Sequence, residues 1–161
     1  MTSAPVSADR RDVIIRQANV DDGAAIAGLE AAAFGSASWG AAGVHAALMR
    51  AENRALVGMT AHRDRSEAVA FGIWRLVADE AEILSIGVAP AERRRGLGRR
   101  LLQAVLETAR RARATRLFLE VDSANTAAVS LYEAAGFHAV GARTRYYRNG
   151  GDAIIMLKSL N

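Results

Sequence analysis

A basic segment in the middle of the chain, residues 88–102, has the composition of an anion-binding turn. It contains the pattern Arg93-x-x-Gly96-x-Gly98, with further arginines inside it at Arg94 and Arg95. The first N–H groups of a helix have no intrahelical partner, and the macrodipole makes that end electropositive. Glycine lets an anion approach the backbone closely and allows a positive φ. The segment therefore predicts a phosphate site, most simply for a pyrophosphate; the alternative is an ordinary turn whose arginines only meet solvent.

Two common phosphate-binding motifs are excluded by the residues that follow Gly98. A P-loop needs a lysine and then a serine or threonine after its last glycine, whereas Arg99 and Arg100 stand there. A dinucleotide fingerprint needs a third glycine at the position of Leu101. The segment is therefore expected to take a different phosphate-bearing ligand.

Glu120 and Tyr132 are the candidates for proton transfer. Glu120 lies in the apolar, strand-like run 117–121, so we expect its carboxylate to be partly desolvated and usable as a general base near neutral pH. The alternative is an edge-strand glutamate that faces solvent. Tyr132 has helical spacing with apolar neighbours, which predicts an inward side chain that is either a core residue or a general acid. Asn125 is a predicted N-cap of the same helix that could equally contact a ligand.

Other catalytic or binding residue sets are weaker or missing. Tyr146 and Tyr147 precede a predicted turn, and strand alternation would expose at least one of them. Their role is either cross-strand packing or forming a wall for a peptide substrate. The histidines share no metal-ligand spacing, and no Ser-His-Asp arrangement is readable: His45, His62 and His138. The chain has no cysteine, hence no thiol nucleophile or disulfide, and we expect no metal site.

The elements that would position these residues form one mixed α/β domain, with an antiparallel front half and a strand–helix–strand crossover behind it. Strands are predicted at residues 13–17, 55–61, 68–77, 82–88, 116–121, 137–147 and 153–157. Helices are predicted from Asp21 or Asp22 to about Phe34, around 44–50, from Arg99 to about 114, and over 126–135 with Gly136 as C′ residue. Residues 35–43 read as a Gly/Ser loop that carries Trp39, and residues 148–151 as the last turn.

Length and composition limit the class of protein. A chain of 161 residues is expected to form a single domain, here 13–161, after a polar N-terminal tail, 1–12, that we expect to be disordered. No apolar run has the length of a membrane span or a signal sequence, so we expect a soluble protein that has no membrane partner. The lack of cysteine fits a reducing cytosol, and a cytoplasmic location is expected. We expect a monomer or a weak dimer.

The net charge of +4 is unevenly distributed. Residues 93–116 contain nine arginines and one acid, Glu107, and thus carry +8, which leaves −4 for the rest of the chain. The arginines are not interleaved with aromatic residues, and no nucleic-acid motif is present. A highly anionic small ligand explains the charge with fewer assumptions than direct contact with nucleic acid, which we do not expect.

In three segments the chain resembles the GNAT superfamily of acetyltransferases and, within it, the RimI type, the bacterial ribosomal-protein-alanine N-acetyltransferases. The first runs from Ile86-Gly87-Val88-Ala89-Pro90 to Leu102 and includes the pattern typical of coenzyme A binding. The second comprises residues 117–121, Asn125 and the stretch 131–137, and the third is Tyr146-Tyr147 followed by 152–156. The likeness extends over nearly the whole chain.

The resemblance implies a GNAT fold: a mixed sheet of about seven strands with about four helices, splayed between the strands that end at Val88 and Val121. Acetyl-CoA would lie in that splay, with the Val88 N–H polarising the thioester carbonyl and Asn125 contacting the pantetheine. Its acetyl, pantetheine and pyrophosphate groups would be bound by Ile86, Gly87, Val88, Arg93, Arg94, Arg95, Gly96, Leu97, Gly98 and Arg99. Glu120 would accept a proton from the substrate α-ammonium, directly or through water, and Tyr132 would donate one to the CoA thiolate.

On the acceptor side the resemblance implies a protein N-terminus, the N-terminal alanine of a small-subunit ribosomal protein, lined by Trp39, Tyr146 and Tyr147. RimI-type enzymes usually have a Phe-Pro-Trp-like element here, whereas residues 34–39 keep the aromatic residues, lack the proline and are longer. This departure bears on the peptide preference and not on acetyl transfer. The alternatives are acetyl transfer to another amine (a protein lysine, another N-terminus or a small amine) and a non-catalytic module that binds CoA or nucleic acid.

Overall fold

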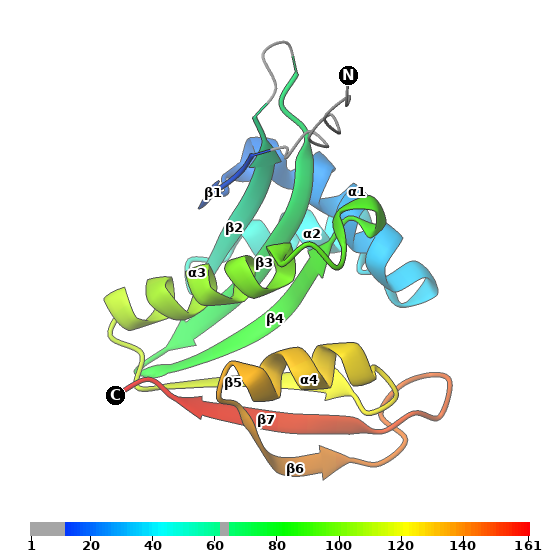
Figure 1. The fold of residues 1–161 in the computed structure, drawn as a ribbon, viewed down its shortest axis with the longest axis vertical. Coiled ribbons are helices and arrows are strands. Elements are labelled where there is room, and N and C mark those ends of the chain that lie inside the picture. The colour runs from blue at the N-terminus through cyan, green and yellow to red at the C-terminus, as the bar shows by residue number, and fades with distance from the viewer. Residues whose placement is uncertain (1–11, 62–64) are drawn as a thin grey trace, which may run out of the picture.

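A seven-stranded mixed sheet forms the centre of the computed structural model, which describes residues 12–61 and 65–161. Its strand order is β1-β2-β3-β4-β5-β7-β6 (Figure 1). The strands are β1 (Val13–Gln17), β2 (Asn53–Thr60), β3 (Ala68–Val77), β4 (Glu80–Val88), β5 (Arg116–Asp122), β6 (His138–Arg143) and β7 (Ala153–Ser159). The β4–β5 pair is parallel, and the other neighbouring pairs are antiparallel. The predicted fold class is thus confirmed.

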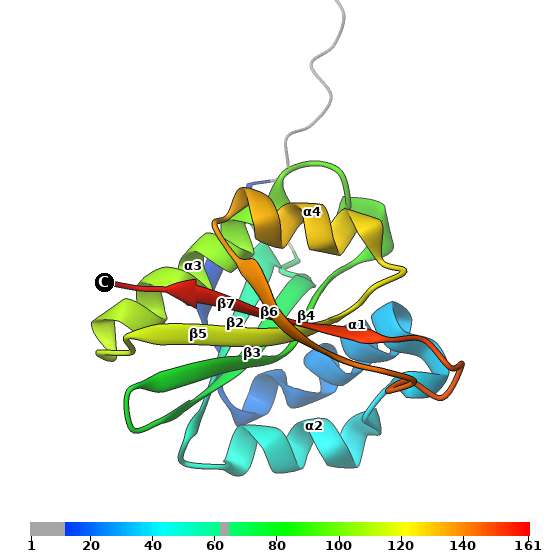
Figure 2. The ribbon, with the colours of Figure 1, turned by 90° about the horizontal axis from the view of Figure 1, so that it is seen from below.

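Four α-helices in the described residues cover the two faces of the sheet: α1 (Gly23–Phe34), α2 (Gly40–Met49), α3 (Leu97–Arg111) and α4 (Thr126–Ala134). Figure 2 shows α1 and α2 on one face, and α3 and α4 on the other. Each face has its own hydrophobic cluster. The larger one, here the α3/α4 core, includes Leu101, Val105, Trp74, Leu119 and Tyr132. The smaller one, the α1/α2 core, consists of Ile26, Ala27, Val44, Ala55, Phe71 and Ile73.

The sheet opens between β4 and β5. Their parallel pairing runs from Glu80↔Arg116 to Ile83↔Leu119 and ends there. The rest of β4 stays paired with β3 as far as Val88, and the rest of β5 stays paired with β7 as far as Asp122. The two strands therefore diverge over their last residues (Figure 1), as the resemblance implied.

The N-terminal helices begin and end differently from the prediction. A short 3-10 turn, Val20–Asp22, precedes α1, and its N-cap is Asn19, whose side chain accepts from the Asp21 N–H at 2.9 Å. Asp22 is the N-cap residue of α1, one of the two predicted positions, but its side chain makes no capping bond to α1 and instead accepts from the Asn19 N–H at 2.9 Å. Helix α2 begins at Gly40 and not near Val44, and Trp39 is its N-cap residue. The predicted loop 35–43 is largely helical as a result.

The connection between the last two strands is longer than predicted. Strand β6 ends at Arg143 and does not continue to Tyr147. Arg145 has a φ of +53°, and its N–H donates to Asp152 Oδ1 at 2.8 Å, so the chain turns away from the sheet here. Tyr146 and Tyr147 consequently lie in a loop, and the argument from strand alternation does not apply to them.

Two further observations concern the described residues. The predicted tail, residues 1–12, falls outside them except for Asp12. None of the helices within 12–61 and 65–161 combines the length and the apolar character that crossing a membrane requires.

Candidate active site

The turn between β4 and α3 ends in a glycine whose conformation opens the start of the helix. A 3-10 turn, Pro90–Glu92, follows β4, and Gly96 then has a φ of +79°, as its residue type predicted. The first helical bond runs from the Arg100 N–H to the Gly96 carbonyl at 3.1 Å. The N–H groups of Leu97, Gly98 and Arg99 precede it, so they have no acceptor within the helix, and Gly96 has no side chain that could cap them.

Gly98 is used differently from Gly96. It is not among the glycines with positive φ, so the freedom predicted for it is not needed. A Cβ at Gly98 would stand 3.8 Å from both Leu131 Cδ2 and Val88 Cγ2, and at Gly96 it would meet nothing within 4 Å. The start of α3 is thus unobstructed beside Gly96, and at Gly98 it lies against the end of β4.

The arginines of the turn surround this helix start. Arg93 Nε donates to the Val88 carbonyl at 3.2 Å, which holds the turn against the end of β4. Arg95 lies 3.5 Å from the buried carboxylate of Glu92. Arg94, with a φ of +62°, and Arg99 are exposed. An anion placed at the Leu97–Arg99 amides would therefore have several guanidinium groups within side-chain reach.

The backbone of Val88 faces the open side of β4. Ala89 N–H donates to the Val69 carbonyl at 2.7 Å, which makes these two residues a hydrogen-bonded pair between β3 and β4. Hydrogen-bonded and non-hydrogen-bonded pairs alternate along an antiparallel ladder. The Ala70↔Val88 and Gly72↔Ile86 pairs are therefore non-hydrogen-bonded, and the N–H groups of Ile86 and Val88 point away from β3, to the side where β5 has diverged. Gly87 lies between them with its amide engaged by β3.

Glu120 lies on an interior strand, beyond the last β4–β5 pair. Strand β5 stands between β4 and β7, so the alternative of an edge-strand glutamate in solvent is wrong. The Glu120 side chain is 21% exposed and its Oε1 is 2.9 Å from Arg143 Nε, an ion pair that the sequence did not predict. The Glu120 carboxylate is thus half-buried, and it forms an ion pair with the Arg143 guanidinium where β4 and β5 have diverged.

Tyr132 points inward from α4, as predicted, and is 6% exposed. Its ring packs edge-on against Phe137, with centroids 5.8 Å apart. Burial, with a smaller contribution from Tyr147, raises the pKa of Tyr132 to about 12. The phenol therefore keeps its proton throughout the physiological pH range and has one to donate.

Glu120 and Tyr132 approach the end of β5 from opposite faces. Leu119 and Val121 belong to the α3/α4 core together with Tyr132, and side chains alternate along a strand. Glu120 therefore projects to the other face, the one that α1 and α2 cover. Two reactants that enter from opposite faces can meet only where the sheet is open, which is beyond Ile83 and Leu119.

The remaining predicted residues lie at the start of α4, in the loop after β6 and at the start of α2. Asn125 caps α4 as predicted, accepting from the Ala128 N–H at 3.1 Å. Tyr147 is half-buried, and its pKa is raised by burial and then by the charges of Asp122 and Glu120. Tyr146 is exposed and packs edge-on against Tyr147 at 5.1 Å. Trp39 is exposed at the start of α2.

Sequence reasoning missed three charged residues of this region. Arg143 contacts Glu120, Asp122 stands near Tyr147, and Glu30 holds the start of α2. Asp122 could have been predicted to lie beside Glu120, because it follows two positions later and alternate strand residues share a face. For Arg143 and Glu30 no local signal exists, because their partners come from other elements.

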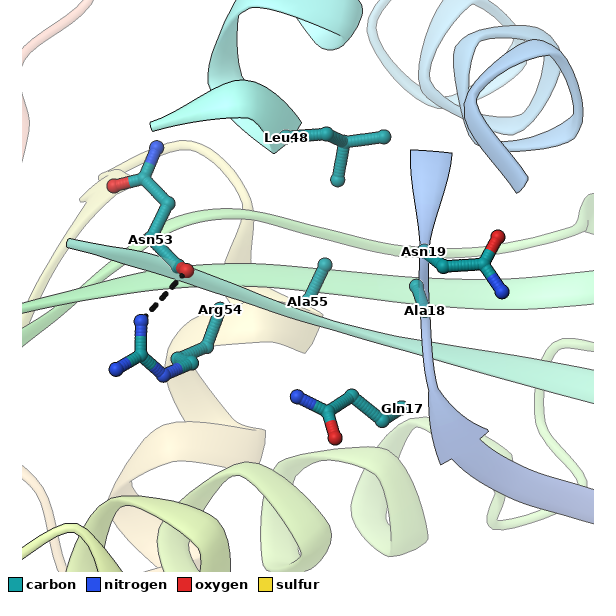
Figure 3. A pocket seen from close by; sticks show the side chains of 7 residues that line it. All are labelled: Gln17, Ala18, Asn19, Leu48, Asn53, Arg54 and Ala55. Atoms are coloured by element: carbon teal, nitrogen blue, oxygen red, sulfur yellow. Dashed lines mark hydrogen bonds between the residues drawn. The ribbon is translucent and has the colours of Figure 1, made fainter. Parts of the chain in front are cut away.

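A pocket of about 70 Å³ lies elsewhere, between the end of β1, the end of α2 and the start of β2. Figure 3 shows its lining side chains, none of which is a predicted site residue: Gln17, Ala18, Asn19, Leu48, Asn53, Arg54 and Ala55. It is too small for a nucleotide. Within the part of the chain that the structure describes, no three His, Cys, Asp or Glu side chains are grouped to hold a metal.

Comparison with known proteins agrees with this geometry. Residues 26–137, well over half of the chain, match the model of the acetyltransferase (GNAT) family. The chain therefore belongs to the GNAT acetyltransferase family.

Within that family, several of its relatives carry names of the RimI type. It is 42% identical over 90 residues to the [ribosomal protein bS18]-alanine N-acetyltransferase of Salmonella typhimurium, a match that covers 54% of this chain and 61% of the relative. It is 49% identical over 78 residues to the N-alpha-acetyltransferase RimI of Mycobacterium tuberculosis, covering 48% of each. The matched part thus spans about half to three fifths of these relatives. The crystal structure of the Escherichia coli ribosomal-protein-S18-alanine N-acetyltransferase superposes with a TM-score of 0.83 at 29% identity, over 93% of this chain and 95% of that one. The predicted resemblance is confirmed.

Proposed function

We propose that this protein is an N-terminal acetyltransferase that transfers the acetyl group of acetyl-CoA to the N-terminal alanine of a small-subunit ribosomal protein. The observation that carries the proposal is the opening of the sheet between β4 and β5, with a free helix start beside it and an acid and a phenol at its two faces. The ribosomal acceptor is supported by the named activity of the relatives. We expect the reaction to take place in the cytoplasm.

The residues at the opening fit the groups of acetyl-CoA. The unpaired amides of Leu97, Gly98 and Arg99 and the nearby arginines suit a pyrophosphate, and the space at Gly96 allows its close approach. The outward N–H of Val88 suits the thioester oxygen. Asn125, at the start of α4, is in the region where we expect the pantetheine arm.

Acetyl-CoA supplies an activated thioester, and the protein's residues handle the protons. The acceptor amine attacks the carbonyl carbon, so that a C–N bond forms while the C–S bond breaks. Glu120 takes the proton that the amine loses, and Tyr132 gives its proton to the departing thiolate. An α-amino group has a pKa near 8, so a carboxylate base is adequate for it, and holding both reactants in one opening contributes much of the acceleration.

The test is intact-mass analysis after incubation with acetyl-CoA and a set of peptides. The set contains an alanine-starting ribosomal peptide, copies that start with serine, glycine or methionine, and an N-blocked copy that contains lysine. Acetylation of the free alanine N-terminus, and not of the blocked copy, is the expected result. Transfer to the blocked copy would identify a lysine acetyltransferase, and no transfer to any amine would identify a binding module. Glu120→Gln is expected to abolish most of the transfer, while Glu133→Gln, an exposed change on α4, serves as the matched control.

A further inference from the structure

The proposed base already holds a cation that belongs to the protein. Arg143 is the last residue of β6, and its Nε lies 2.9 Å from Glu120 Oε1. Strand β7 stands between them: Asp122 pairs with Ala153, and Ala153 with Arg143. Arg143 therefore shares a sheet face with Glu120 and reaches it across β7. The Arg143 side chain is 55% exposed, against 21% for Glu120, so the pair is accessible from the acceptor side.

The guanidinium of Arg143 has a second partner within reach. Its Cζ lies 5.3 Å from the centroid of the Tyr146 ring, a distance typical of a cation–π contact. Tyr146 in turn packs against Tyr147. The Arg143 guanidinium thus lies between the Glu120 carboxylate and the Tyr146–Tyr147 pair. It can break the ion pair with Glu120 and keep its contact with the Tyr146 ring.

The other charged and titratable groups near Glu120 do not replace this cation. Asp122 lies on the same strand and the same face, and Tyr147, from the β6–β7 loop, is within electrostatic range of both carboxylates. An acceptor that arrives as an α-ammonium would bring a second cation to a carboxylate that Arg143 already occupies. Two like charges at one carboxylate oppose each other.

We infer that Arg143 is an internal competitor of the acceptor: its guanidinium occupies the position that the substrate α-ammonium takes beside Glu120, and it leaves Glu120 but stays on the Tyr146 ring when the acceptor binds. This inference rests on the proposed function. It identifies Arg143 as a positioning residue that weakens acceptor binding without touching the reacting atoms.

The test measures binding of the alanine-starting peptide by calorimetry to the protein saturated with CoA, together with KM and kcat for transfer from acetyl-CoA. Arg143→Gln is expected to tighten peptide binding and lower the KM by about two- to fivefold, the size expected of a partly exposed ion pair. The kcat should change less than about twofold on the same grounds, and CoA affinity should not change. Arg143→Lys keeps the charge and should stay close to the wild type. Arg148→Gln, an exposed change in the loop that follows β6, is the matched control.

The possible outcomes separate the inference from the proposed function. A wild type that acetylates no amine refutes both. A wild type that acetylates the peptide while Arg143→Gln binds it equally well or more weakly refutes only the inference. Tighter binding by Arg143→Lys, to the same extent as by Arg143→Gln, also refutes it, because the effect would then not come from charge.

Discussion

Replacement of Glu30 by alanine is expected to destabilise the protein and to loosen the segment that carries Trp39. Glu30 lies on α1 and is 1% exposed. Its Oε1 accepts from the Trp39 N–H at 2.9 Å, and its Oε2 accepts from the Ser38 hydroxyl. The carboxylate therefore binds the N–H of the α2 N-cap residue and fixes the turn between the two helices. The Ser38 hydroxyl in turn accepts from the N–H of Gly40, the first residue of α2, at 3.0 Å.

The expected magnitude follows from these two hydrogen bonds. A hydrogen bond to a charged group contributes about 1.5–3 kcal/mol, so the two bonds together could contribute roughly 3–6 kcal/mol. The alanine variant also removes the cost of burying a charge, and the freed Ser38 hydroxyl can turn to water. We therefore expect a net loss of about 2–4 kcal/mol in the free energy of unfolding, which for a chain of this length lowers the Tm by roughly 5–15 °C.

The assay is chemical and thermal unfolding of Glu30→Ala beside Ser38→Ala. The serine variant removes one of the two bonds to Glu30 and the bond from the Gly40 N–H, and it is expected to cost about 1–2 kcal/mol. The KM for the peptide should rise in Glu30→Ala because Trp39 is no longer held. CoA affinity should stay unchanged, since the helix start of α3 lies on the other face of the sheet. A loss below about 1 kcal/mol for Glu30→Ala would refute the reasoning, because the carboxylate would then contribute no more than an ordinary surface residue.

The remaining predictions concern the opening of the sheet. Glu120→Gln should lower kcat by roughly a hundredfold or more with little change in CoA affinity; a large loss of CoA affinity in a binding titration would contradict its role. Tyr132→Phe should lower kcat as well. Because the folded pKa of Tyr132 is about 12 and the unfolded pKa about 10, wild-type stability that is present below pH 10 should be lost as the pH rises toward 12, and unfolding titrations of the phenylalanine variant should lack this loss. Gly87→Ala would place a Cβ 2.8 Å from Phe71 and should cost about 1–3 kcal/mol of stability by denaturant unfolding. Gly96→Ala meets nothing within 4 Å but keeps a φ of +79°, and should cost about 1 kcal/mol.

The parts of the site that depend on local chain geometry were predictable from the sequence. The helix start at Gly96 follows from residues within one turn of it, and the positive φ there agrees with the choice of glycine. The inward direction of Tyr132 and the cap by Asn125 likewise follow from short-range spacing. These features are set by contacts a few residues apart, which is the range over which sequence patterns are informative.

The parts that depend on strand register were not predictable. The ion pair of Glu120 with Arg143 crosses an intervening strand, so it requires two registers that no pattern in either segment indicates. The ending of β6 at Arg143 depends on a hydrogen bond from Arg145 to Asp152, and without it the alternating sequence reads as a longer strand. Glu30 has the pattern of an ordinary helical residue, and only the turn that follows α1 brings its two donors to it.

The two hydrophobic clusters lie on opposite faces of one sheet, so the proposed CoA-binding helix start of α3 and the helix α2 that follows Trp39 pack against different clusters. Val44 of α2 belongs to the α1/α2 core, whereas Leu97, at the start of α3, belongs to the α3/α4 core. Substitutions in the smaller cluster that spare Phe71, which lies beside Gly87, are therefore expected to reshape the proposed acceptor side while the proposed CoA-binding helix start keeps its own support. A lineage built on this plan can exchange one acceptor for another in small steps, each of which leaves the acetyl donor in use.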